Sequence, residues 1–422
     1  MTRSRPPAPV DLNDAGVFGD GIPHDAFAVM RAADGLSWTE ADDRVGAGFW
    51  SVTRHRDVLT VSRDPDTYSS AVGHIQIYDI DPDALDARAS MIDLDPPVHT
   101  RLRRLVSAAF TPRRVQGYRA GIRRRVRRAL DELERNGSGD WVSTVAAPIP
   151  IGVICDLMGV PEDDHGYLIE LSDHLVAGTA NEPLEPTAYG NTTDLRLLPF
   201  NSPAAHAMAS YALDLADRRR LEPTDDLVSA LTAAEIDGER LTDDEVANFF
   251  RLMIFAGNET TRSAMAHLPL QLQQFPEVLA ALMTDRSLLG AAAEEVVRYS
   301  SPILYFRRTL TRSATLSGTE LEPGDKVVMW YASANFDPAA LDEPLAFRLD
   351  RSAPAGSGAG HVGFGGGGVH HCLGASLARL ELVELLDEVL TRGTRFGEVG
   401  RPRYVESNFV NGIERLDVAV GR

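Results

Sequence analysis

The sequence predicts a mainly α-helical protein with a small β region, and two observations carry this expectation. Apolar residues recur at helical spacing over much of the 422-residue chain, most clearly over residues 99–133, 141–159, 165–178, 203–221 and 374–392. Residues 48–64 predict a short strand followed by a helix, and residues 318–337 predict two strands around the turn EPGD. Because no proline- or glycine-rich linker divides the chain, we expect one domain over residues 1–422, with a loose start over residues 1–15.

The best-defined single element is a long helix within residues 241–277. Thr242 and Glu245 have the spacing of a capping box, so the helix begins there. A helix that continues to Gln274 is roughly 50 Å long at about 1.5 Å per residue, which is enough to cross the molecule. Its stretch FFRLMIFAG is apolar nearly all round, which indicates that the middle of the helix is buried.

The buried middle of this helix carries the sequence AGNETT, which an ordinary core does not need. Gly257 costs about 1 kcal/mol relative to alanine inside a helix, and a buried Glu259 is expensive unless it is paired. One interpretation is that Gly257 permits close helix packing while Glu259 pairs with an arginine. The other is that Gly257 makes room for a flat ligand, with Glu259, Thr260 and Thr261 forming a proton path beside it. The sequence leaves both open.

The charge balance limits the partners of the protein. The net charge of −19 at pH 7 argues against non-specific binding to nucleic acid. Arginines gather between His99 and Leu130, where eleven arginines and no acidic residue occur. This arginine-rich stretch is either the solvated face of two helices or a docking surface for an acidic partner or an anionic group.

The two cysteines, Cys155 and Cys372, cannot build a disulfide framework, so a reducing compartment such as the cytoplasm is expected. Cys155 lies in the apolar run IGVICDLMGV and is expected to be a packing residue. The first residues lack the apolar segment of a secretory signal, and no uninterrupted apolar stretch of about 18 residues occurs. We therefore expect no membrane anchor.

Cys372 stands in the segment HVGFGGGGVHHCLGASLARLEL, residues 361–382, which limits its chemistry. A zinc site is disfavoured because His370, His371 and Cys372 are consecutive, and consecutive side chains do not converge easily on one tetrahedral ion. A nucleophilic cysteine is disfavoured because no Asn or Asp partner is evident. A phosphate-binding loop would need a following Lys-Ser/Thr pair or a preceding strand in a βαβ unit, and neither is present.

A third use of one cysteine is as the axial thiolate of haem iron, because the porphyrin supplies four other ligands. The glycines would let the backbone approach a flat macrocycle closely and adopt positive φ angles. A periodic helix begins directly after Cys372, so its sulfur would lie at a helix amino terminus, which stabilises a thiolate.

The segment resembles the haem-binding loop of the cytochrome P450 family. The family pattern Phe-Gly-x-Gly-x-His/Arg-x-Cys-x-Gly is matched by Phe364, Gly365, Gly367 or Gly368, His370, Cys372 and Gly374. Phe364 lies eight residues before Cys372, where the usual spacing is seven, and some actinobacterial steroid and lipid hydroxylases share this longer loop. AGNETT, EEVVRYSSP and DPPVHTRLRRLVSAAFTPRRV resemble other family segments in the expected order. The resemblance extends from about residue 20 to the end of the chain.

The resemblance implies the cytochrome P450 fold, with haem between the long central helix and the helix that follows the cysteine loop. It implies that Cys372 is the axial ligand of the haem iron, and that further haem contacts come from His99, Arg103, Arg308, His370, Phe364, Gly365, Gly374, Ala256 and Gly257. Cationic or donor groups would meet the haem propionates, namely His99, Arg103, Arg308 and His370. EEVVR resembles the family's ExxR motif and PLAFRLDR its later meander, which implies a buried network of Glu295, Arg298 and Arg351.

The same resemblance implies a monooxygenase that inserts one oxygen atom of O2 into a C–H or C=C bond of a bulky hydrophobic small molecule. Glu259 and Thr260 would be the acid and the alcohol that deliver protons for oxygen activation. The cofactor would be haem b, with electrons from NAD(P)H through a ferredoxin reductase and a ferredoxin. Arg104, Arg113 and Arg114 would dock the ferredoxin on the side of the haem where Cys372 would bind the iron. We expect a cytoplasmic monomer.

By the same analogy, the substrate contacts would come from Ile75, Ile77, Val176, Ala256, Ile303, Leu304 and Val410. These side chains are aliphatic, which suits a bulky apolar ligand. AGNETTR, the long glycine loop and SNFVNGIERLDV resemble actinobacterial enzymes that act on steroids, branched lipids or terpenoids. The unusual segments 69–92 and 179–203 leave a tailoring enzyme for a polyketide or peptide natural product as the alternative.

Two other haem-protein functions are disfavoured by the helix residues. A haem sensor or electron carrier needs no proton relay, so the pair Glu259–Thr260 argues against it. Peroxide-driven oxygenation would be favoured by an arginine in place of this pair, and the sequence has none there.

Overall fold

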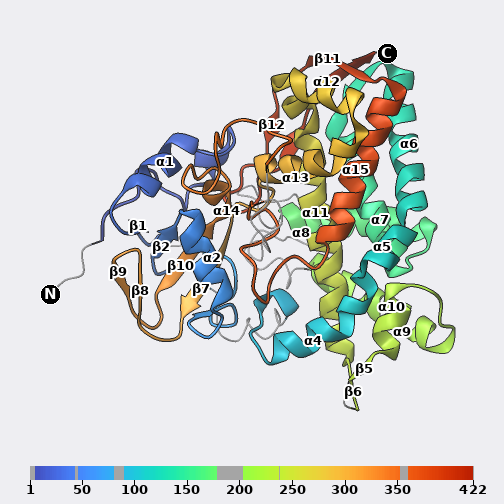
Figure 1. The fold of residues 1–422 in the computed structure, drawn as a ribbon. Coiled ribbons are helices and arrows are strands. Elements are labelled where there is room, and N and C mark those ends of the chain that lie inside the picture. The colour runs from blue at the N-terminus through green and yellow to red at the C-terminus, as the bar shows by residue number, and fades with distance from the viewer. Residues whose placement is uncertain are drawn as a thin grey trace.

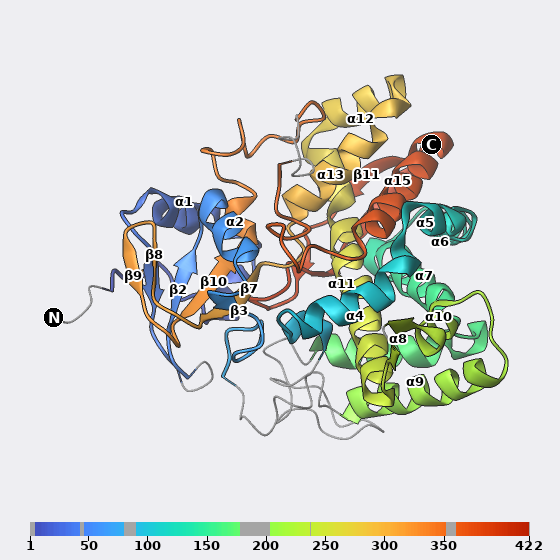
Figure 2. The ribbon, with the colours of Figure 1, turned by 60° about the horizontal axis from the view of Figure 1, so that its bottom comes forward.

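A computed structural model of the protein describes residues 5–42, 46–79, 90–177, 203–236, 238–351 and 360–421. Helices fill one side of the molecule, and the largest β-sheet lies on the other side with the amino-terminal segment beside it (Figure 1). A second view, turned by 60°, shows the same division (Figure 2). The predicted class, mainly helical with a small β region, is confirmed.

The helices are spread along the whole described chain. Their bounds are α1 (His24–Ala32), α2 (His55–Arg63), α4 (Val98–Ser107), α5 (Pro112–Gly117), α6 (Arg119–Asn136), α7 (Pro148–Met158), α8 (His165–Ala177), α9 (Pro203–Leu221), α10 (Leu227–Ala233), α11 (Asp243–Gln274), α12 (Pro276–Thr284), α13 (Leu289–Ser300), α14 (Tyr331–Ala334) and α15 (Ala375–Arg392).

Two predicted helices are interrupted where proline or an irregular turn intervenes. The helix predicted over residues 99–133 is divided into α4, α5 and α6, because a 3-10 turn at Ala108–Phe110 follows α4 and Pro112 begins α5. The helix predicted over residues 141–159 starts with a π-helical turn, Val142–Ala146, and continues as α7 from Pro148. Proline suits the first turn of a helix because the amide hydrogen that it lacks has no helical partner there.

The central helix α11 has the predicted capping box. The amide of Glu245 donates to the Thr242 hydroxyl at 3.2 Å, and the Glu245 carboxylate accepts from the Thr242 amide at 2.9 Å. The helix is 32 residues long, and α7, α8, α9, α13 and α15 all pack against it. It therefore forms the axis of the helical side, which Figure 1 shows as the yellow-green helix running through the molecule. Among the described residues, no helix combines the length and apolarity that crossing a bilayer requires.

The strands form one main sheet and several small ones. They are β1 (Ser37–Thr39), β2 (Phe49–Val52), β3 (Tyr68–Ser69), β4 (Ser138–Asp140), β5 (Glu235–Ile236), β6 (Glu239–Arg240), β7 (Tyr305–Leu310), β8 (Ala314–Leu316), β9 (Thr319–Leu321), β10 (Lys326–Trp330), β11 (Arg395–Val399), β12 (Arg403–Tyr404), β13 (Ile413–Arg415) and β14 (Asp417–Gly421). The main sheet has the order β1-β2-β10-β7-β3, in which β2 and β10 are parallel and the other pairs antiparallel.

One expectation about the strand region needs correction. The strands predicted around EPGD both form, but they do not pair with each other, because β9 pairs with β8 while β10 pairs with β2 and β7. Residues 5–8 lie against β1. The amide of Ala8 donates to the Trp38 carbonyl at 2.8 Å, the Trp38 amide donates to the Pro6 carbonyl at 2.7 Å, and the Arg5 guanidinium lies 4.0 Å from the centre of the Trp38 ring.

An aromatic cluster around Trp330 joins the sheet to the rest of the core. Trp330 is fully buried, and its ring lies 5.4 Å from that of Phe27 on α1 and 5.0 Å from that of Tyr305 on β7, centre to centre. These residues belong to the same continuous core as the middle of α11. The sheet is thereby fixed relative to the central helix, and strand β7 is held beside the site described next.

Candidate functional site

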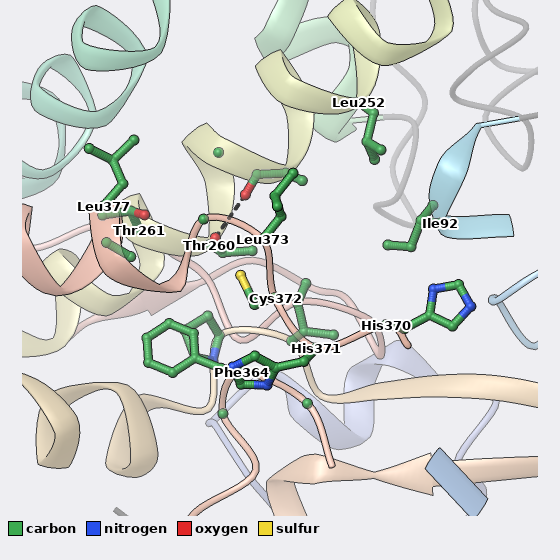
Figure 3. A pocket seen from close by; sticks show the side chains of 18 of the residues that line it. Ile92, Leu252, Thr260, Thr261, Phe364, His370, His371, Cys372, Leu373 and Leu377 are labelled. Carbon is green, nitrogen blue, oxygen red and sulfur yellow. Dashed lines mark hydrogen bonds between the residues drawn. The ribbon is translucent and has the colours of Figure 1, made fainter. Parts of the chain in front are cut away.

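A cavity lies between the middle of α11 and the loop that precedes α15. Its empty volume is about 1390 Å³, including the part that opens to solvent. Helix α11 contributes one wall with Phe249, Leu252, Met253, Ala256, Gly257 and Thr260, and the loop contributes the facing wall with Phe364, Gly365, His370, His371, Cys372 and Gly374. Figure 3 shows Thr260 on α11 above Cys372 on the loop.

Cys372 is presented at the amino end of α15. Its amide donates to the Phe364 carbonyl at 3.0 Å, which closes the loop, and its side chain is accessible from the cavity. Burial within the protein raises the pKa of the Cys372 thiol, while the amides of Gly374 and Ala375 and the charge of Arg103 act in the opposite direction. Those amides and that charge are the groups that stabilise a thiolate.

The glycine run 365–368 was predicted to leave room for a macrocycle. In the structure it mainly allows the loop to pack closely against α2. Gly365, Gly367 and Gly368 have φ angles of +93°, +85° and +73°, which favour glycine. A Cβ on Gly366 would lie 2.8 Å from the Ser62 Cβ, and one on Gly368 would lie 2.4 Å from the Ser62 carbonyl oxygen. The Ser62 hydroxyl donates to the Gly367 carbonyl at 2.9 Å. The run therefore packs the loop against the end of α2. Of its four glycines, Gly365 alone lines the cavity.

The α11 wall combines close packing with an exposed hydroxyl. A Cβ on Gly257 would lie 2.5 Å from the Ile154 Cδ1 on α7, so this glycine permits helix packing, as the first interpretation of AGNETT predicts. Gly257 also lines the cavity together with Ala256 and Thr260. The Thr260 hydroxyl donates to the Ala256 carbonyl one turn earlier at 2.8 Å. This bond holds the hydroxyl at the cavity wall.

Glu259 lies beside the cavity but not in its lining. Its side chain is 4% exposed, and a carboxylate oxygen lies 3.6 Å from the Arg262 guanidinium. The Ser263 hydroxyl donates to the other carboxylate oxygen at 3.4 Å. Glu259 is thus paired with an arginine, and its side chain has to turn around α11 to reach the cavity.

Two of the four predicted propionate contacts are buried polar groups left without full protein partners. Arg308 on β7 is 3% exposed and donates to the Arg307 carbonyl at 2.8 Å, and within the described parts of the chain it forms no ion pair. Burial lowers the pKa of Arg308. The Nδ1 atom of buried His99 has no hydrogen-bond partner among the described residues, and burial, with a contribution from Arg103, lowers the pKa of His99 to about 4. An unpaired buried cation and an unpartnered imidazole nitrogen are costly unless an acceptor is supplied.

The other two predicted propionate contacts already have protein partners. Arg103 donates to the His371 carbonyl at 2.6 Å. The Nε2 of His370 lies 3.1 Å from the Ser70 hydroxyl, and its ring centre lies 4.3 Å from that of His99. Burial lowers the pKa of His370 to about 2, so its ring is neutral. Arg103 and His370 line the same cavity as His99, but their bonds to the protein orient the loop.

The predicted network of Glu295, Arg298 and Arg351 forms. Arg298, which is fully buried, donates twice to the Glu295 carboxylate, at 2.7 and 2.8 Å. The Arg351 Nε lies 3.0 Å from the same carboxylate. Arg298 also donates to the carbonyls of Asn335 and Pro344, at 3.0 and 2.7 Å. The network therefore ties α13 to the segment that follows α14.

Haem fits this arrangement. Among the described residues, no group of three His, Cys, Asp or Glu side chains is arranged to hold a metal ion by itself. One accessible thiol suffices for a macrocycle that brings four ligands of its own. Its two carboxylates suit Arg308 and His99, which lack full partners. Cys372 would hold the iron, and Thr260 lies across the cavity from Cys372.

The structure corrects the predicted substrate residues. Ala256 and Ile303 line the cavity. The side chains of four others are core residues that are at most 5% exposed, namely Ile75, Ile77, Leu304 and Val410. Neighbouring residues of an extended chain point to opposite sides, so Leu304 faces the core when Ile303 faces the cavity. The side chain of Val176 lies outside the described residues.

Sequence reasoning missed most of the apolar lining. The cavity is also lined by Met91, Ile92, Phe249, Leu252, Met253 and Phe306. Three of these lie in the run FFRLMIFAG at the helical spacing that leads to Thr260, so the periodicity of α11 could have found them. Met91 and Ile92 lie in a short 3-10 turn, which no periodic pattern in the sequence predicts.

Comparisons with known proteins agree with this site. The family model described as cytochrome P450 matches residues 210–392. The chain is 38% identical to a methyl-branched lipid omega-hydroxylase of Mycobacterium tuberculosis, over 98% of this chain and 95% of that protein. It is 34% identical to a steroid C26-monooxygenase of Mycolicibacterium smegmatis, over 98% and 94%. A solved structure of a Mycobacterium marinum cytochrome P450 in complex with pseudoionone superposes with a TM-score of 0.85 at 36% identity, covering 99% of both chains.

These relatives span nearly the whole chain. The chain belongs to the cytochrome P450 family and is a monooxygenase of that family.

Proposed function

We propose that this enzyme hydroxylates an unactivated C–H bond of a steroid, a terpenoid or a branched lipid, with haem b bound through Cys372. The haem, when bound, supplies the activation of dioxygen. The observation that carries the substrate class is the apolar wall facing Cys372. Epoxidation of a C=C bond in the same molecules would use the same site.

Among the described residues, the walls that would hold the substrate contain no charged side chain. They are formed by Met91, Ile92, Phe249, Leu252, Met253, Ala256, Ile303 and Phe306. The charged residues that line the cavity in the described part of the chain, Arg103 and Glu381, come from α4 and α15 rather than from these walls. A ligand whose reacting end lacks charge is therefore favoured, because a charged end would be buried without a partner. The lipid and steroid activities of the relatives support this class.

Thr260 and Glu259 have separate tasks in proton delivery. Thr260 is placed in the cavity with its hydroxyl hydrogen directed at the Ala256 carbonyl, so its oxygen lone pairs are free to accept. Glu259 would bring protons from the side of Arg262 by turning its carboxylate. Removing the hydroxyl should separate the consumption of reductant from the formation of product.

Electrons would come from NAD(P)H through a ferredoxin reductase and a ferredoxin that docks on the arginine-rich stretch. Part of that stretch is occupied, because Arg119 and Arg123 pair with Glu384 of α15 at 3.0 and 2.7 Å. Arg104, Arg113 and Arg114 are exposed, although Arg114 lies 3.6 Å from Asp225, and these three arginines would receive the ferredoxin. Free Cys155 and Cys372 fit a reducing compartment such as the cytoplasm, and we expect the enzyme to act as a monomer.

Spin-state titration tests the proposed substrate class. The haem-loaded enzyme is titrated with a steroid, with pseudoionone and with a methyl-branched fatty acid, while the Soret band reports displacement of iron-bound water. At least one of the three should give a saturable low-to-high-spin shift, and Leu252→Gln should weaken it without changing the spectrum of the ligand-free enzyme. No shift with any of them, together with a shift from a polyketide or peptide natural product, would replace this class by the tailoring alternative.

A further inference from the structure

A carboxylate next to the ExxR pair points the other way, toward the cysteine loop. Glu294 on α13 precedes Glu295, but its partners are Arg379 of α15 and His361 at the start of the loop. The Arg379 Nε and Nη2 both donate to it, the latter at 3.2 Å, and the His361 Nε2 lies 2.9 Å from its second oxygen. Burial alone would raise the pKa of Glu294, but the hydrogen bonds from His361 and Arg379 lower it to about 2.

The histidine is held in one tautomer. The Gly363 amide donates to the His361 Nδ1 at 3.0 Å, so this nitrogen carries no hydrogen. The Nε2 therefore bears the hydrogen and donates it to Glu294. His361 and Arg379 together satisfy the carboxylate from two segments, which fixes α13, α15 and the start of the loop relative to one another.

Arg379 stands where its charge acts on the loop. Its guanidinium carbon lies 4.3 Å from the centre of the Phe364 ring, which is a cation–π contact. Phe364 in turn accepts the amide hydrogen of Cys372 with its carbonyl. Arg379 is also one of two arginines whose charge favours the ionised form of the Cys372 sulfur, Arg103 being the other. The side chain of Arg379 is 32% exposed, so it can turn to solvent if nothing holds it.

We propose that Glu294 is a positioning residue for the thiolate: it holds the Arg379 guanidinium over Phe364, and that fixed positive charge sets the reduction potential of the iron bound by Cys372. The inference rests on Cys372 as the iron ligand. It assigns Glu294 a role separate from that of its neighbour Glu295, whose bonds reach Arg298 and Arg351 instead.

The sign of the potential shift should differ between two substitutions of Glu294. A positive charge near the thiolate favours the reduced iron, so Arg379→Met should lower the ferric–ferrous potential. Glu294→Gln removes a negative charge but keeps an oxygen that accepts from Arg379, so it should raise the potential. Glu294→Ala releases Arg379 to solvent, and it should therefore lower the potential although it also removes a negative charge.

Spectroelectrochemical titration of the haem-loaded variants tests this, with Arg379→Lys as the conservative change. Glu294→Ala should lower the potential in the natural background and raise it in the Arg379→Met background, where no guanidinium is left to release. Arg379→Lys should shift the potential less than Arg379→Met does. Glu388→Ala serves as the control. Glu388 lies farther along α15 and pairs with Arg127 of α6 and with Arg392, so this change should leave the potential unchanged.

A shift of the same sign for Glu294→Ala in both backgrounds, or equal shifts for Glu294→Ala and Glu294→Gln, would overturn the proposal, as would no shift in any variant. The carbonyl complex of each reduced variant is recorded in parallel. If the unaltered protein itself lacks the red-shifted band of thiolate-bound haem, the assignment of Cys372 fails, and this outcome is distinguishable from failure of the positioning role.

Discussion

The Thr260 hydroxyl donates to the Ala256 carbonyl at 2.8 Å, within the stretch of α11 that faces Cys372 across the cavity. The bond uses the hydrogen of the hydroxyl and leaves its lone pairs toward the cavity, where a proton donor can bind.

Thr260→Ala should uncouple the reaction. Without the hydroxyl, the consumption of NAD(P)H continues, while the fraction that ends in hydroxylated product falls several-fold and hydrogen peroxide appears instead. Thr260→Ser keeps the hydroxyl and should retain most of the coupling. The ratio of product to NAD(P)H consumed measures the effect, and an unchanged ratio in Thr260→Ala would rule out the proposed role.

Glu295→Gln should destabilise the protein by about 3–5 kcal/mol, because it leaves the fully buried Arg298 without its charged partner. Denaturant unfolding measures the loss. Glu414→Gln is the matched control, since Glu414 pairs with Arg403 at the surface at 2.9 Å, and it should cost no more than about 1 kcal/mol. Equal losses for the two variants would show that burial of the ExxR pair does not matter to stability.

His267 should make stability depend on pH between about 6.5 and 4. Burial lowers the pKa of His267 to about 4, while its Nδ1 bonds to the Ser263 carbonyl at 2.8 Å. Between these values the unfolded chain binds a proton that the folded protein does not, so stability falls as pH decreases. At pH 5 this group should cost about 2 kcal/mol.

His267→Gln should remove that share of the pH dependence. The free energy of unfolding is measured from pH 7.5 to pH 4.5 for both proteins. The variant's curve should be the flatter one, and parallel curves would contradict the assignment.

Gly368→Ala should destabilise the cysteine loop more than a positive φ angle alone explains. Gly318 is the matched control, because its φ angle of +79° resembles the +73° of Gly368 while nothing lies within 4 Å of an added Cβ. Gly318→Ala should cost about 1–2 kcal/mol. Gly368→Ala adds the clash with Ser62 and should cost more, with faster loss of haem to apomyoglobin. Similar stabilities of the two variants would show that the loop does not depend on its packing against α2.

The sequence was most informative where one local signal decides the structure. The capping box of Thr242 and Glu245 located the start of α11, and the loop around Cys372 pointed to haem through the chemistry of a single thiol. The Glu295–Arg298 pair follows from helical spacing, which places residues three apart on one face.

Side chains set by tertiary packing were harder to predict. Leu304 and Val410 were expected at the substrate, but the direction of an extended segment depends on how it crosses the core, which local pattern does not determine. The glycine run was expected to face a macrocycle, whereas its contact with Ser62 brings together residues about 300 positions apart. Glu294 went unnoticed because its partners come from two distant segments.

The carbonyl complex of the reduced, haem-loaded protein shows whether Cys372 binds the iron. If Cys372 is the axial ligand, the complex of the unaltered protein shows the strongly red-shifted Soret band of thiolate-bound ferrous haem, and Cys372→Ala abolishes that band. Its absence from the folded, haem-loaded protein, or its persistence in Cys372→Ala, would contradict the account.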